Sequence, residues 1–466
     1  MKKYKDFSKN LIVTLGPITN SVSAIKRIAK STDIFRLNGS HNTITWHEKT
    51  SSSIKRQNSQ NVILLDIPGI KPRTLNTEYI NIKKKEKICF YFRKTKTILN
   101  IDRFVKISNE IPFTKIKKKF FSIDDGLNQF KIFDYNKDYI IGISQGSFEL
   151  KSNKGLNIPE SIYNETKQFN KYSTFLRKAK KVNFDAIGLS FIQSKDLLVK
   201  IKKIYSNKLI ISKIENYQGI RNSDEIVQYS DAVMIDRGDL AAEIGSNKLF
   251  NAVIEISRLC KKYGTPLIMA TENLESMIKN NSPSKSEIMS LELNKLISVD
   301  KIMLSSETAI SSNWKNIISW LDEYFSNYKE SNHGLKLIKK TKDIYNKETS
   351  IWSSLHLNES QTLLISTKSG SAIYKCKQYL DKPRIYIFTD NLKTYFLSKF
   401  FCNTKTFLVP KLDKKNAAKQ VLFFAKKYSK YLFKYTSNII SIFVLNPRKG
   451  ARANSVYMIN KKDLKI

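Results

Sequence analysis

Residues 211–216 read ISKIEN and residues 236–240 read DRGDL, and each stretch follows a short apolar run. We interpret both apolar runs as buried strands that end where the charged residues begin. In a parallel sheet, strand carboxyl ends face the same way, so Glu215 and Asp239 are predicted to share a hard cation. Lys213 would then point at the anion that the cation holds. This arrangement is the outline of a phosphoryl-transfer site.

The same pattern recurs along the chain. Short apolar runs that end in a polar residue alternate with helical stretches, at residues 11–15, 33–37, 62–66, 185–190, 208–213, 231–236, 266–271 and 300–305. Strands that alternate with helices indicate a parallel sheet, and this number of them closes a (β/α)₈ TIM barrel of the α/β class. Functional residues of such barrels lie at the carboxyl ends of the strands.

Two regions depart from the barrel pattern. Residues 75–156 alternate in short strand-like pieces with a turn signal at 124–126, which predicts a small β-barrel lid inserted after the third strand. After about residue 335, apolar runs at 363–366, 384–388 and 439–444 predict a C-terminal α/β domain. We therefore expect barrel segments at 1–74 and 157–334, an insert at 75–156 and a C-terminal domain at 335–466.

Composition limits the class of protein. The chain has 466 residues, 41% of them hydrophobic, and no uncharged apolar run long enough to span a membrane. No apolar stretch follows the basic start, so we expect no signal peptide. The cysteines are far apart and form no CxxC pair, which predicts reduced thiols and a cytoplasmic location.

The formal net charge of +40 invites a nucleic-acid interpretation. The lysines, however, are scattered among many asparagines and isoleucines, as an A- and T-rich genome would produce. The aromatic residues form no recognisable RNA-binding motif around them. We expect no specific nucleic-acid partner, and a positive surface that draws in small anions. A basic nucleic-acid-binding protein stays as an alternative that rests on charge alone.

Single residues of this pattern are weak signals. A carboxylate at a strand end is more often a helix N-cap or an ion-pair partner than a metal ligand. Taken together, Lys213, Glu215 and Asp239 favour a cation site over these alternatives, because the two acids repel each other unless a cation or a base neutralises them. Residues 367–371 open a predicted helix and suit a phosphate, although an ordinary N-cap turn explains them equally well.

These residues carry a family resemblance. The stretches ISKIEN and RGDL, together with MATENLESM at 269–277 and MLSSETA at 303–309, resemble pyruvate kinase motifs in order and spacing. TLGP at 14–17, FRLNGSH at 35–41, DDG at 124–126 and KGLNIP at 154–159 extend the resemblance over nearly the whole chain. The resemblance implies transfer of phosphate from phosphoenolpyruvate to ADP, giving pyruvate and ATP in the last step of glycolysis.

The resemblance also implies roles for individual residues. Glu215 and Asp239 would bind Mg²⁺ or Mn²⁺, while Lys213 and Arg36 neutralise the phosphoryl group. Backbone N–H groups at Gly238 and Asp239 would hold the substrate carboxylate, and Thr271 would organise a water that protonates the enolate. The residues implied for the nucleotide phosphates are Asn38, His41, Arg73 and Lys154.

A monovalent-cation site matches the family in part. The resemblance implies oxygens from the side chains of Asn38, Ser40 and Asp66 and from the backbone of Ile67. Lys71, however, stands where potassium-dependent members carry glutamate. An ammonium there can substitute for the potassium charge, so we predict activity without K⁺.

Other implications of the resemblance are a homotetramer and an effector phosphate bound by Thr367, Lys368, Ser369 and Ser371. Departures from the family motifs, such as Pro68 for lysine and Glu272 for glutamine, keep a second hypothesis open. In that hypothesis the chain is a non-catalytic or regulatory relative. The residues implied for catalysis, Arg36, Lys213 and Thr271, are all present, which favours an active kinase.

Overall fold

The computed structural model describes residues 9–93, 101–112, 119–327, 362–380, 384–413, 416–434, 436–443 and 455–464. Its central feature is a closed barrel of parallel strands in the order β1-β16-β15-β14-β13-β12-β3-β2. The strands are β1 Leu11–Leu15, β2 Thr32–Asn38, β3 Val62–Ile67, β12 Ala186–Leu189, β13 Leu209–Ile214, β14 Ala232–Asp236, β15 Leu267–Ala270 and β16 Lys301–Leu304. Each falls on one of the predicted apolar runs, so the (β/α)₈ prediction is confirmed.

Helices cover the outside of the barrel. They are α1 Val22–Ile28, α2 Ile44–Gln57, α3 Glu165–Lys178, α4 Lys195–Ile204, α5 Tyr217–Arg221, α6 Ser223–Tyr229, α7 Arg237–Ile244, α8 Ser246–Tyr263, α9 Lys285–Leu296, α10 Ser306–Ala309 and α11 Trp314–Asn327. Several begin at a polar N-cap, such as Ser21 and Ser194, whose side chain accepts a backbone N–H of the first turn. Apolar helix residues such as Ile256 and outward-facing strand residues such as Leu65 belong to one large core. Burial of these apolar surfaces stabilises the barrel.

The segment between β3 and α3 is built from β-strands, as predicted. The strands are β4 Ile80–Ile82, β5 Lys87–Tyr91, β6 Arg103–Lys106, β7 Phe120–Ile123, β8 Asn128–Tyr135, β9 Tyr139–Ser144, β10 Phe148–Leu150 and β11 Leu156–Asn157. Described strand pairing gives a six-stranded sheet and a separate two-stranded sheet. The insert has its own core, centred on Phe90, Phe121 and Phe130.

The C-terminal region forms a second α/β layer. Its sheet has the order β19-β18-β17-β20-β21, with strands β17 Thr362–Ser366, β18 Arg384–Thr389, β19 Thr404–Leu408, β20 Asn438–Phe443 and β21 Ser455–Asn460. The helices are α13 Ser371–Tyr379, α14 Leu392–Ser398, α15 Ala417–Lys427 and α16 Ser429–Leu432. The predicted boundary at residues 334 and 335 lies outside the described residues, and the domain boundaries stay a prediction.

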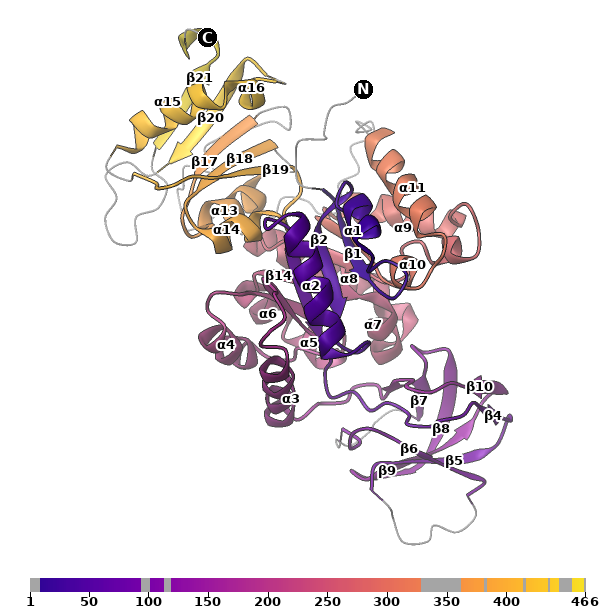
Figure 1. Ribbon diagram of the computed structural model, residues 1–466. Coiled ribbons are helices and arrows are strands. Elements are labelled where there is room, and N and C mark those ends of the chain that lie inside the picture. The colour runs from indigo at the N-terminus through magenta and orange to yellow at the C-terminus, as the bar shows by residue number, and fades with distance from the viewer. Residues whose placement is uncertain are drawn as a thin grey trace.

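The C-terminal region packs on the amino-terminal end of the barrel. Asp231 and Asp300, which precede strands β14 and β16, bind Tyr374 and Lys377 of α13. Apolar side chains of the barrel interior share one core with C-terminal residues such as Leu363 and Phe400. Figure 1 shows the insert and the C-terminal sheet at opposite ends of the barrel. The carboxyl ends of the barrel strands therefore face the insert.

The four cysteines, Cys89, Cys260, Cys376 and Cys402, are free thiols, as predicted. Burial raises the pKa of Cys260 to about 12. This thiol is therefore protonated and behaves as a small apolar side chain.

Candidate active site

Lys213 lies among carboxylates at the carboxyl end of β13. Its Nζ atom is 2.7 Å from Glu215 Oε1 and 3.2 Å from Asp66 Oδ2, and it donates to Ser190 Oγ at 3.2 Å. Although burial alone would lower the pKa of Lys213, the charges of Asp66 and Glu215 raise it. Lys213 is therefore a fixed positive charge in a buried position.

Arg36 adds a second buried cation. Its Nε and Nη2 atoms donate to Asp66 Oδ2 at 2.9 and 2.7 Å, and its Nη1 atom donates to Thr14 Oγ1 at 3.0 Å. Although burial alone would raise the pKa of Asp66, Lys213 and Arg36 lower it. Asp66, on β3, thus holds both cations, Arg36 on β2 and Lys213 on β13, by charge-assisted hydrogen bonds and ion pairs.

Three carboxylates gather beside Lys213. Oxygens of Glu215, Asp236 and Asp239 lie within 4.8 Å of one another. Burial raises the pKa of Glu215 to about 8 and that of Asp236 to about 6, in each case against the opposing charge of Lys213. A divalent cation would offset the repulsion among these acids, and oxygen ligands suit Mg²⁺ or Mn²⁺. The donor set therefore fits such a cation.

Asp236 was not among the predicted site residues. It ends strand β14 just as Glu215 follows β13, so the rule that selected Glu215 could also have selected it. Its Oδ2 atom is 3.9 Å from Lys213 Nζ. Ser190 is a second residue that the sequence did not reveal, because a serine at a strand end carries no distinct signal.

Lys71 connects the barrel to the insert. Its ammonium forms an ion pair with Asp239, at the start of α7, and lies 3.6 Å from Asp125 Oδ1, in the turn between β7 and β8. Although burial alone would lower the pKa of Lys71, these two carboxylates raise it. A side chain on Gly155 would press against the Lys71 side chain, so a glycine at this position leaves room for the lysine.

Three of the oxygen donors expected at the monovalent-cation site, those of Asn38, Asp66 and Ile67, already accept hydrogen bonds or ion pairs. Asn38 Oδ1 accepts from the backbone N–H of Ser40 at 3.1 Å, and the backbone carbonyl of Ile67 accepts from Ser190 at 3.3 Å. Asp66 binds Arg36 and Lys213, as above. Within the described ranges, no hydrogen bond or ion pair joins the Lys71 ammonium to these residues; its partners are Asp239 and Asp125.

Thr271 lies beside the first turn of α7. The backbone N–H of Gly238 donates to Thr271 Oγ1 at 3.2 Å, and this hydroxyl is 3.1 Å from Asp236 Oδ1 and 2.8 Å from the Ala270 carbonyl. Thr271 has a positive φ of 58°. A threonine in this left-handed conformation is strained and is held by its surroundings. The structure thus brings Thr271, Gly238 and Asp239 to one rim.

The residues expected to bind nucleotide phosphates come from both the barrel and the insert. Arg73 Nη1 donates to the Asn153 carbonyl at 3.1 Å, and Lys154 Nζ pairs with Asp124 Oδ1 at 2.6 Å. Desolvation and the positive charges of Arg73 and Arg36 lower the pKa of His41. His41 and Arg73 are therefore near one another, and Lys154 is engaged by an acid of the insert.

The loop expected to bind an effector phosphate lies in the C-terminal region, before α13. The backbone N–H of Gly370, which has a φ of 80°, donates to Thr367 Oγ1 at 3.1 Å. Ser369 Oγ lies 3.1 Å from Ser371 Oγ, and the Lys368 carbonyl accepts from Thr394. These contacts close a turn before α13, and phosphate binding there stays a prediction.

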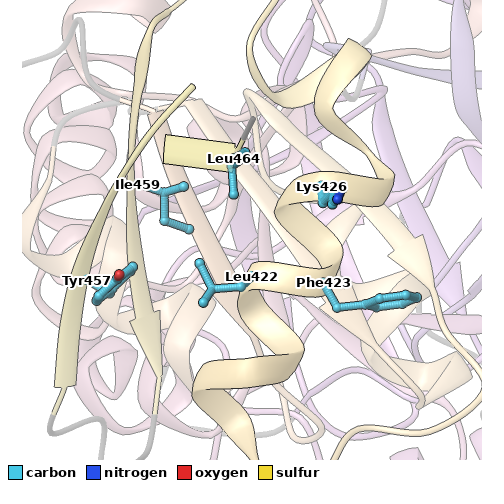
Figure 2. Close-up of a pocket in the computed structure, with 6 residues that line it drawn as sticks. All are labelled: Leu422, Phe423, Lys426, Tyr457, Ile459 and Leu464. Carbon is cyan, nitrogen blue, oxygen red and sulfur yellow. The ribbon is translucent and has the colours of Figure 1, made fainter. Parts of the chain in front are cut away.

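A separate pocket of about 330 Å³ lies in the C-terminal region, between α15 and β21 (Figure 2). Its lining is mostly apolar and consists of Leu422, Phe423, Lys426, Tyr457, Ile459 and Leu464. The lining lacks carboxylates, so this pocket has none of the chemistry found at the barrel rim.

Among the described residues, no helix is both long and apolar enough to cross a membrane.

A family model and the curated relatives described below all point to the same protein family. The family model described as "Pyruvate kinase, barrel domain" matches residues 7–315. The chain is 29% identical to pyruvate kinase of Trypanoplasma borreli over 65% of its length and 62% of that protein. It is 26% identical to pyruvate kinase of Thermotoga maritima, over 84% of this chain and 86% of that one. Pyruvate kinase 2 of Saccharomyces cerevisiae is 30% identical over 64% of this chain and 62% of that protein. The chain thus spans less than two thirds of the first and third of these relatives.

Proposed function

This chain belongs to the pyruvate kinase family, a family of phosphotransferases that generally use a divalent metal, and from this membership we propose that it is an active pyruvate kinase. The proposed reaction transfers the phosphoryl group of phosphoenolpyruvate to ADP. A β-phosphate oxygen of ADP bonds to phosphorus, the bond from phosphorus to the enol oxygen breaks, and the resulting enolate takes a proton at carbon to give pyruvate. As a glycolytic enzyme, the protein would work in the cytoplasm.

The observation that carries the proposal is the position of Lys213. Its ammonium is buried, permanently charged and held at a strand end by Glu215 and Asp66. Arg36 contacts the same oxygen of Asp66, Oδ2, as Lys213 does. Two fixed cations would neutralise charge on the phosphoryl group as it moves from the enol oxygen of phosphoenolpyruvate to the β-phosphate oxygen of ADP.

Other residues would bind the two substrates and help to protonate the enolate. The backbone N–H groups at the first turn of α7, around Gly238 and Asp239, suit the carboxylate of phosphoenolpyruvate. Thr271, whose hydroxyl lies beside this turn, would orient the water that protonates the enolate. Arg73, Lys154, Asn38 and His41 would bind the nucleotide phosphates.

Glu215 and Asp239 would hold Mg²⁺ or Mn²⁺. When bound, the cation neutralises charge on the phosphoryl and enolate oxygens. The homotetramer and the effector phosphate remain proposals that follow from the family.

A coupled assay for pyruvate and ATP, with phosphoenolpyruvate, ADP and Mg²⁺, tests the proposal. We expect activity in the wild type and its loss in Lys213→Met and Asp239→Ala. Lys200→Met, which changes an exposed lysine of α4, is the control and should stay active. A folded wild-type protein without activity would favour the non-catalytic relative instead.

A further inference from the structure

We propose that Asp236 is a third carboxylate ligand of the divalent cation, beside Glu215 and Asp239. The inference rests on the proposed metal site and extends it with a residue that the sequence pattern did not select. It follows from the position of Asp236 and from the charges of its neighbours.

Asp236 has the placement that a ligand needs. It is the last residue of β14, only 8% exposed, and it contributes an oxygen to the carboxylate group that spans 4.8 Å. Its Oδ1 atom accepts from Thr271, and its Oδ2 atom is 3.9 Å from Lys213 Nζ. Lys213 is therefore too distant for a hydrogen bond to Oδ2, although it provides a neighbouring positive charge.

Lys71 explains why a third carboxylate is needed. The Lys71 ammonium pairs with Asp239 and so reduces the negative charge that Asp239 presents to a cation. Asp236 adds a further carboxylate beside Glu215 and Asp239, and its negative charge would offset the positive charge that Lys71 places on Asp239. Without Asp236 the attraction of this group for a divalent cation would be weaker.

The ligand chemistry follows from the donor atoms. Carboxylate oxygens without any nitrogen or sulfur ligand favour a hard cation such as Mg²⁺ or Mn²⁺. Three carboxylates also supply more charge than a pair, so the chain should bind such a cation before any substrate is present.

The test is calorimetric titration of Mn²⁺ into the full chain without substrate. Asp236→Asn keeps the shape of the side chain and an acceptor for Thr271 but removes the charge. We expect the Mn²⁺ dissociation constant to rise by about tenfold or more in this variant. Lys71→Met should lower the constant by several fold, because it frees Asp239. Asp196→Asn, an exposed change in α4, is the matched control and should leave the constant unchanged.

Circular dichroism and the melting temperature check that each variant is folded, and Asp236→Ala replaces the asparagine variant if that one unfolds. An Mn²⁺ constant within about twofold of the wild type in a folded Asp236 variant would overturn the inference, provided that Glu215→Gln weakens binding. A wild type that binds no Mn²⁺ would overturn it too. The titration needs no catalysis, so loss of the proposed kinase function and loss of this inference are separate results.

Discussion

The buried Lys71 and the partly buried Asp239 form an ion pair that joins the segment after β3 to the first turn of α7. The lysine ammonium also lies 3.6 Å from Asp125 of the insert. One side chain thus contacts the barrel rim and the insert that faces it. A carboxylate of the insert thus lies beside the ion pair at the barrel rim.

The first prediction concerns K⁺. With Lys71 supplying a positive charge at the rim, we expect the kinase activity to change by less than about twofold when K⁺ replaces tetramethylammonium at fixed ionic strength. Lys71→Met should lose activity and regain part of it with K⁺. Gly155→Ala adds a Cβ that crowds Lys71, so we expect it to lose activity as Lys71→Met does. Gly146 has open space around the position of an added Cβ, so Gly146→Ala serves as the control. An increase of about tenfold with K⁺ in the wild type would contradict the prediction.

A second prediction concerns Thr271. Thr271→Val removes the hydroxyl that binds Gly238 and Asp236, so we expect kcat to fall by about tenfold to a hundredfold through loss of proton delivery. Thr271→Ser keeps the hydroxyl and should retain most activity. Exchange of the methyl protons of pyruvate with deuterated solvent, followed by NMR, should slow in parallel with kcat. Normal exchange in the valine variant would show that another group organises the proton.

Asp66→Asn should destabilise the protein. Asp66 holds both Arg36 and Lys213, and its neutralisation leaves two buried cations undercompensated, at a cost of about 3–5 kcal/mol. Calorimetry should show a lower melting temperature. For comparison, Glu225→Gln breaks the exposed pair of Glu225 with Lys195, and we expect it to leave the melting temperature unchanged. Equal melting temperatures for wild type and Asp66→Asn would show that the asparagine still satisfies both cations.

A fourth prediction concerns Glu243, whose burial should make the stability of the protein depend on pH. This residue is fully buried, and burial raises its pKa from 4.5 to about 8. Between these values Glu243 binds its proton more fully in the folded state than in the unfolded state, so its contribution to stability is complete below pH 4.5 and is lost as pH rises towards 8. Glu243→Gln should flatten the fall in melting temperature over this range. Glu149→Gln, an exposed change on β10, should not. Parallel curves for wild type and Glu243→Gln would mean that Glu243 does not titrate there.

Gly264 tests the contact between the barrel and the C-terminal region. It ends α8 with a φ of 71°, and an added Cβ would overlap the backbone carbonyl of Tyr374 in α13. We expect Gly264→Ala to lower the melting temperature and to speed tryptic cleavage between the two regions. Gly146→Ala again provides the control, and matching cleavage rates for the two variants would argue against a tight contact at Gly264.

Much of the fold was predictable from the sequence because barrel strands are local signals. Each apolar run, such as the one before Lys213, is long enough for a buried strand and ends in a polar residue. The lengths between the runs suit helices, and the long interval before residue 185 marks the insert. The strand-end rule also located Lys213, Glu215 and Asp239, which the structure brings to one rim.

Only the tertiary structure decided the partners of these residues. Lys71 and Asp239 are 168 positions apart, and no local pattern predicts that the ammonium turns towards this carboxylate and towards Asp125. The strand-end rule could have selected Asp236, but only the paired strands show that its carboxylate lies within 4.8 Å of those of Glu215 and Asp239. The sequence by itself determined which strands form and which charges stand at their ends, because both depend on short-range periodicity. Pairing among those charges depends on distances of a few ångströms between distant segments, and the closed barrel and the insert above it set those distances.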